Sequence, residues 1–140
     1  MYLLPLKHLV AASLLLSAAT ASNRMYDRAT MTNYAHSPAV VTINYASCKK
    51  DVFTVPAAPD GIAWQPTVAT APTRRGACLI TSITATLQGD TSTVTAYSST
   101  GTSYSQFYVR KPFCSSGGWR IWSKKEYSTN SSGCFGGRHR

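Results

Sequence analysis

The chain has 140 residues and a formal charge of +9, from 14 basic and 5 acidic residues. This length suits one domain with a modest hydrophobic core and leaves no room for a second domain. With so few carboxylates and only 3 histidines, the composition disfavours most acid–base hydrolases and metal centres.

Residues 1–21 are typical of a secretory signal peptide. Lys7 and His8 precede an apolar run at 9–16, and the small-residue sequence Ala-Thr-Ala follows at 19–21. The run is too short to span a bilayer, so we expect cleavage near Ser22 and export, to the extracellular space or to a bacterial periplasm. Loss of Lys7 lowers the formal charge from +9 to +8, and the mature chain stays strongly cationic.

Residues 22–38 are polar and show no apolar period, which predicts a flexible N-terminal leader. The folded β domain is then expected at 39–135, followed by a basic tail at 136–140. This tail would add long-range attraction to any polyanion.

Alternating apolar and polar residues predict the strands. The first pair is expected at 39–45 and 51–55. Further alternation at 79–87, 93–97 and 104–109 predicts three successive strands that form an antiparallel meander. The meander needs turns at 88–90 and 99–101, where glycine accompanies polar residues.

The fold class that follows is all-β. No window of eleven or more residues keeps apolar residues at helical spacing, so we expect little or no helix. Short strands with frequent turn signals predict a single small antiparallel β-sandwich or barrel stapled by disulfides.

Four cysteines, Cys48, Cys78, Cys114 and Cys134, lie in the expected mature chain. An even number in an exported protein indicates two disulfides, and three pairings are open. We favour Cys48–Cys78 with Cys114–Cys134, because each bridge then closes a moderate loop. The wide spacing does not suit zinc, and no phosphate-binding glycine loop or EF-hand loop occurs, so no metal or cofactor is expected.

Residues 56–77 interrupt the strand pattern with four prolines around Trp64. A structureless connection of this length is unusual in a compact domain unless it binds a ligand or covers the core. Trp64 is therefore a candidate ligand-binding residue, and the alternative is that its ring only covers the edge of the sheet.

Basic and aromatic residues gather in the C-terminal third. Residues 101–140 hold seven basic residues against one acid, Glu126. If 118–124 is a strand, Arg120, Trp122 and Lys124 project to one side, and Trp119 and Ile121 to the other. An exposed tryptophan between two cations would suit an anionic head group, a phosphate or a sugar acid.

The alternative is that Trp122 lies under the loop closed by Cys114 and Cys134, and that the cations only solubilise the fold. Under the binding interpretation, the ligand-binding residues are Trp64, Arg110, Lys111, Trp119, Arg120, Trp122, Lys124 and Lys125.

Catalysis has few candidate groups in the mature chain. His36 and His139 lie in the expected leader and tail, and several carboxylates lie in turns or loops. A small cationic nuclease could combine His36, Glu126 and an arginine as a metal-free acid–base set. We predict no catalytic residue and keep the nuclease as a further alternative.

Short segments resemble, in order, bacterial lysozyme inhibitors of the small β-barrel type. They are 45–48, 100–104 and 122–124, followed by a late cysteine. The resemblance implies a secreted inhibitor of an extracellular enzyme. As an alternative function, a protein-directed inhibitor would insert 56–77 or 99–104 into the enzyme's cleft, although 56–77 has no counterpart in that family. The segments cover a small part of the chain, and a strongly cationic inhibitor would repel lysozymes, which are usually cationic.

The first expectation is therefore a secreted, cationic, non-enzymatic binding protein that engages an anionic membrane, cell-wall polymer or acidic glycan. A toxin, antimicrobial or effector role suits this chemistry. A protein target belongs to the inhibitor alternative, and no specific nucleic acid is expected, because export makes cell envelopes the more natural polyanion.

Overall fold

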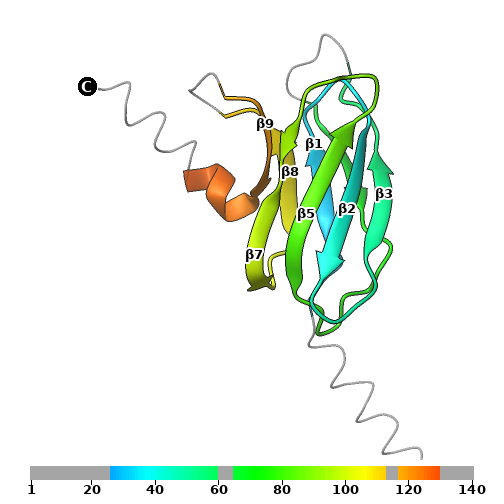
Figure 1. The fold of residues 1–140 in the computed structure, drawn as a ribbon, viewed down its shortest axis with the longest axis vertical. Coiled ribbons are helices and arrows are strands. Elements are labelled where there is room, and N and C mark those ends of the chain that lie inside the picture. Colours follow the sequence, from blue (N-terminus) through cyan, green and yellow to red (C-terminus); the bar gives the residue numbers. More distant parts are fainter. Residues whose placement is uncertain (1–25, 60–64, 113–116, 130–140) are drawn as a thin grey trace, which may run out of the picture.

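The computed structural model describes residues 26–59, 65–112 and 117–129. These residues form two packed β-sheets and one short helix at 124–129 (Figure 1). The all-β expectation is confirmed. The strands are β1 (Thr30–Asn33), β2 (Ala39–Tyr45), β3 (Asp51–Val55), β4 (Thr67–Thr70), β5 (Ile80–Leu87), β6 (Val94–Thr95), β7 (Tyr97–Thr102), β8 (Gln106–Arg110) and β9 (Trp119–Ser123).

The four-stranded sheet has the order β3-β2-β5-β7, and all its pairs are antiparallel. In β2, buried and half-buried residues alternate along the whole strand. One side of the strand therefore faces the core, as the period of two predicts. The predicted strands at 39–45 and 51–55 are confirmed, and 79–87 is confirmed from Ile80 onward.

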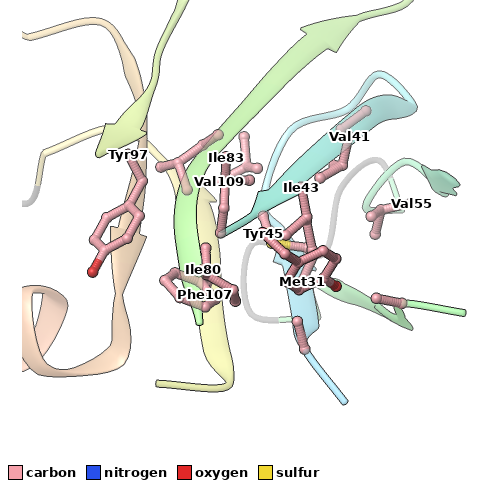
Figure 2. Close-up of a cluster of buried hydrophobic side chains, with 14 of the residues drawn as sticks. Met31, Val41, Ile43, Tyr45, Val55, Ile80, Ile83, Tyr97, Phe107 and Val109 are labelled. Carbon is pink, nitrogen blue, oxygen red and sulfur yellow. The ribbon is translucent and has the colours of Figure 1, made fainter. Parts of the chain in front are cut away.

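The five-stranded sheet has the order β4-β1-β8-β9-β6. β1 lies parallel to β8, and β8 lies antiparallel to β9. Side chains from both sheets meet between them, and Figure 2 shows Met31 and Phe107 close to Ile43 and Ile80. All four are completely buried, which gives the small domain one continuous core.

The predicted meander is wrong. β5 pairs with β7 in one sheet, whereas β6 and β8 belong to the other sheet. The expected turn at 99–101 lies inside β7, and only the turn at 88–90 occurs. Gly101 has a φ of +139° and faces Leu79, whose side chain would lie 3.2 Å from an added Cβ. The glycine serves close packing inside a strand rather than a reversal of the chain.

The flexible leader is also wrong for its described part. β1 lies within residues 22–38, and Met31 and Asn33 are completely buried. Asn33 takes an inward position where a strand usually has an apolar residue. Its amide donates to the carbonyls of Ser37 at 2.9 Å and Pro56 at 3.1 Å, and its carbonyl accepts from the Ala35 amide. These bonds satisfy the buried side chain.

Residues 56–77 are not a structureless loop. They contain the edge strand β4, which pairs with β1 and lies between Pro66 and Pro72. Prolines are tolerated beside an edge strand because they interrupt few ladder hydrogen bonds. Trp64 lies outside the described residues, so the expectation for its ring stays a prediction.

The disulfide Cys48–Cys78 confirms the first favoured pairing. Cys114 and Cys134 lie outside the described residues. A structural disulfide is typical of proteins held outside the reducing cytosol.

Arg75, three residues before Cys78, is only 1% exposed. Its guanidinium donates to the carbonyls of Cys78, Thr102 and Tyr104 at 2.7–3.2 Å, and to the Ser105 hydroxyl at 2.9 Å. The segment that carries the disulfide is thereby joined to the connection between β7 and β8.

Candidate basic and aromatic binding site

The parallel pairing of β1 with β8 brings the ends of these strands to one end of the five-stranded sheet. β9 begins at the same end because it runs antiparallel to β8. Side chains from these strand ends line a pocket of about 200 Å³, which we call the Arg110 pocket. It is lined by Tyr34, His36, Ala58, Gln65, Pro66, Arg110, Lys111 and Trp119. Three predicted ligand-binding residues, Arg110, Lys111 and Trp119, therefore do come together.

Arg110 contacts two aromatic rings. Its guanidinium carbon lies 4.4 Å from the centroid of the Tyr34 ring and 5.2 Å from that of Tyr127, and one of its nitrogens donates to the Tyr127 hydroxyl. Such cation–π contacts engage the plane of a guanidinium. The side chain is thus positioned at the wall of the pocket rather than moving freely in solvent.

A third tyrosine completes this aromatic cluster. The Tyr108 ring lies 4.9 Å from Tyr127 and 6.3 Å from Tyr34, and the Tyr34 and Tyr127 rings are stacked. Burial raises the pKa of the Tyr108 and Tyr127 phenols. Both rings therefore stay neutral at physiological pH, and the cluster keeps the positive charge of Arg110.

Lys111 and Trp119 also line the pocket and contact each other. The Lys111 ammonium lies 5.3 Å from the centroid of the Trp119 ring. Trp119 packs against the core and also lines the pocket, which agrees with its predicted inward direction on β9. Its ring therefore has both a structural contact and an accessible edge.

His36 comes from the connection between β1 and β2. Its Nδ1 lies 3.1 Å from the Ala58 carbonyl oxygen. Because a carbonyl only accepts, Nδ1 carries the hydrogen, an assignment made from the hydrogen-bond partner. This bond orients the imidazole at the rim of the Arg110 pocket.

The expected exposure of Trp122 is wrong. Its side chain shares a face with Arg120 as predicted, and the Arg120 guanidinium lies 4.6 Å from its ring centroid. The residue is nevertheless only 7% exposed. The helix at 124–129 lies beside the ring, since Lys125, Glu126 and Thr129 line one shallow pocket with it. Its Nε1 also donates to the Arg110 carbonyl at 3.1 Å, so Trp122 supports the site from within.

Lys124 does not continue the strand face, because β9 ends at Ser123. Lys124 and Lys125 are exposed on the helix and line a separate pocket with Tyr104, at the opposite end of β8 from Arg110. The predicted basic residues therefore divide between two places instead of forming one strip.

Ser123 and Glu126 explain why the strand stops. The Ser123 hydroxyl accepts from the Glu126 amide at 3.2 Å, and the Glu126 carboxylate accepts from the Ser123 amide at 3.0 Å. This is a capping box, Ser-x-x-Glu, and it was readable in the sequence. The capping box starts the helix that brings Tyr127 to Arg110. The strand interpretation of this region missed Tyr127. Tyr34 was missed because it fell in the expected leader.

The proposed acid–base set is only partly assembled. His36 lines the pocket with Arg110, whereas Glu126 caps the helix and is absent from the lining. Over 26–59, 65–112 and 117–129, no three histidine, cysteine or carboxylate side chains gather in a way that could bind a metal. Within the same ranges, no helix has the length and apolar character to cross a membrane.

Comparisons of the chain with protein-family models, with curated proteins and with solved structures found no match in any of the three.

Proposed function

We propose that this chain is an exported, non-enzymatic binding protein that engages anionic surfaces through the Arg110 pocket and nearby basic side chains. The observation that carries the proposal is the convergence of Arg110, Lys111 and His36 with two aromatic rings in one concavity. Positive and aromatic groups in a shaped pocket are suited to a ligand that is both anionic and partly apolar.

The charge of the segment from β8 to the helix supports the same proposal. Arg110, Lys111 and Arg120 lie at the pocket end of β8 and β9, whereas Lys124 and Lys125 lie on the helix at the opposite end of β8. The acid in this part of the chain, Glu126, is engaged at the helix start. We therefore expect positive potential at both ends of β8, which raises the encounter rate with polyanions.

Export is part of the proposal. The signal-peptide pattern at 1–21 predicts it, and the Cys48–Cys78 bridge is consistent with an oxidising compartment. In such a compartment the available polyanions are membranes, cell-wall polymers and acidic glycans rather than intracellular nucleic acids.

Co-sedimentation tests the proposal. The purified chain is mixed with phosphatidylserine vesicles or with insoluble acidic polysaccharide at 50 and 500 mM salt. We expect binding to at least one of these and release at high salt. Replacing Lys111, Lys124 and Lys125 by glutamine should weaken binding roughly 100-fold, at about 1 kcal/mol per basic residue.

The matched control replaces Lys49, Lys50 and Arg74 by glutamine. This removes the same charge from exposed positions that are not on β8, β9 or the helix. If both triple variants lose affinity equally, net charge alone drives binding and the assigned surface is wrong. If the unmodified chain binds neither material at low salt, the proposed function itself is rejected.

A further inference from the structure

We propose that the Arg110 pocket takes a single acidic sugar residue of a polysaccharide, with the sugar's carboxylate on Arg110 and Lys111 and its ring beside Trp119. This inference rests on the proposed function and names the ligand class for the same site. It is argued from the size, lining and surroundings of the pocket.

The size of the pocket favours one small group. Sites for drug-sized ligands typically measure about 300–1,000 Å³, whereas the Arg110 pocket measures about 200 Å³. One ring with its substituents fits such a space, and the rest of a polymer would continue over the surface. Among the described residues, no carboxylate that would repel an anion lines the pocket.

Arg110 and Lys111 supply the recognition of a carboxylate. A planar guanidinium matches the two oxygens of a carboxylate in a bidentate arrangement, and a neighbouring ammonium adds a point charge. Tyr34 and Tyr127 already restrict the guanidinium. Less side-chain freedom is therefore lost when an anion binds, which raises affinity.

The remaining lining suits a sugar ring. A pyranose has apolar C–H faces and polar hydroxyl edges, so it needs a flat apolar surface together with hydrogen-bonding groups. Trp119 and Tyr34 offer aromatic surface, and Gln65 and His36 offer polar side chains around it. Placed polar groups beside an aromatic surface can orient a ligand in a pocket.

A membrane fits this place less well. Proteins that enter the interface of a bilayer present exposed tryptophan or aliphatic side chains, but Trp122 is 7% exposed and Trp119 is partly buried against the core. Four large hydrophobic side chains are exposed in the described part of the chain: Tyr26, Val52, Val68 and Tyr104. None of the four lines the Arg110 pocket.

Calorimetric titration with trigalacturonate at 150 mM salt tests the inference. We expect saturable binding by the purified chain and at least a tenfold weaker response to the methyl-esterified trisaccharide, which keeps the ring and removes the charge. Arg110→Lys keeps the charge but loses the planar fork, and it should weaken trigalacturonate binding about tenfold.

The double variant Arg110→Gln, Lys111→Gln should lose binding at least 100-fold, whereas Lys49→Gln, Lys50→Gln carries the same charge change and should bind within about twofold of the parent chain. Near-ultraviolet circular dichroism of each variant establishes that the fold is kept. Arg110→Lys supplies the test if the double variant does not fold.

Several outcomes overturn the inference. Equal binding of the free acid and its ester, or unchanged binding by Arg110→Lys, would show that Arg110 does not recognise the carboxylate of the sugar. Binding to phosphatidylserine vesicles without binding to trigalacturonate rejects the sugar and leaves the proposed function standing. Failure to bind any anionic probe rejects both.

Discussion

Arg75 and Arg110 lie near opposite ends of β8 and differ in what surrounds them. Near the start of the strand, Arg75 is 1% exposed and its guanidinium donates to backbone carbonyls and one hydroxyl. At the end of the strand, Arg110 is half-buried, contacts two tyrosine rings and lines a pocket. The same side chain is thus part of the interior in one place and part of a surface site in the other.

The comparison separates stability from recognition. Burial lowers the pKa of Arg75, a sign that its charge is kept away from water. The carbonyl oxygens around it offset this desolvation and fix three chain segments. Ring contacts hold Arg110 without requiring a fully buried charge. Variants at the Arg75 end should therefore lower the free energy of unfolding, and variants at the Arg110 end should lower the affinity for the ligand.

The largest effect is expected for Arg75→Met. The substitution leaves the carbonyls of Cys78, Thr102 and Tyr104 without their donor, so the free energy of unfolding should fall by about 3–5 kcal/mol. Urea denaturation at pH 7 measures it. Arg74→Met, at the exposed neighbour, is the control and should stay within about 0.5 kcal/mol of the parent. Equal effects at the two positions would contradict the structural role that we assign to the buried guanidinium of Arg75.

Next in size is the loss of the Cys48–Cys78 bridge, which closes a loop of 30 residues. The double variant Cys48→Ser, Cys78→Ser should lower the free energy of unfolding by about 3 kcal/mol. Trigalacturonate affinity, measured well below the unfolding transition, should be unchanged because the bridge lies away from the Arg110 pocket. A folded variant with weakened binding would contradict the separation between the two ends.

A smaller effect is expected for Ser123→Ala, which removes the side-chain half of the capping box. The loss of an N-cap hydroxyl lowers stability by about 1 kcal/mol. Hydrogen exchange at the Glu126 and Tyr127 amides should accelerate, whereas Ser98→Ala, at an exposed position on β7, should leave these rates unaltered. Unchanged exchange in Ser123→Ala would show that packing against Trp122, rather than the cap, holds the helix.

The smallest effect is expected for Tyr127→Phe. The ring contact with Arg110 remains and the hydroxyl, which accepts from Arg110, is lost, so the free energy of unfolding should change by less than about 1 kcal/mol. Trigalacturonate affinity should fall roughly two- to fivefold because Arg110 is less restricted. Tyr104→Phe, at the other end of β8, provides the matched control. Parent-like affinity in Tyr127→Phe would mean that Arg110 needs no positioning by the helix.

Strand positions were predictable where one face alone is buried. In β2 the side chains of Val41, Ile43 and Tyr45 point inward at every second position. Pairing was less predictable because most strands adjacent in sequence belong to different sheets. A register shift between Ile80 and Ser82 also breaks the simple alternation in β5. β1 was missed because one of its two inward residues is the polar Asn33, and one partner of this side chain, the Pro56 carbonyl, comes from a distant segment.

The candidate site was predictable in its residue types rather than its shape. Arg110, Lys111 and Trp119 were selected from local charge and aromaticity, and they line one pocket. The burial of Trp122 follows from the helix after β9, which a strand period cannot reveal but the Ser123–Glu126 spacing could. The contribution of Tyr34 depends on the pairing of β1 with β8, which no local pattern encodes.

The parallel pairing of β1 with β8 has a consequence for biogenesis. Thr30 is aligned with Gln106, so β1 cannot pair with β8 until β8 has been synthesised. Contacts of such long sequence separation slow folding and leave a strand edge open meanwhile. During vectorial synthesis the β2–β3 hairpin can form first, whereas the five-stranded sheet closes only after β8 and β9 have been synthesised. Nascent β1 is thus the segment most in need of chaperone protection.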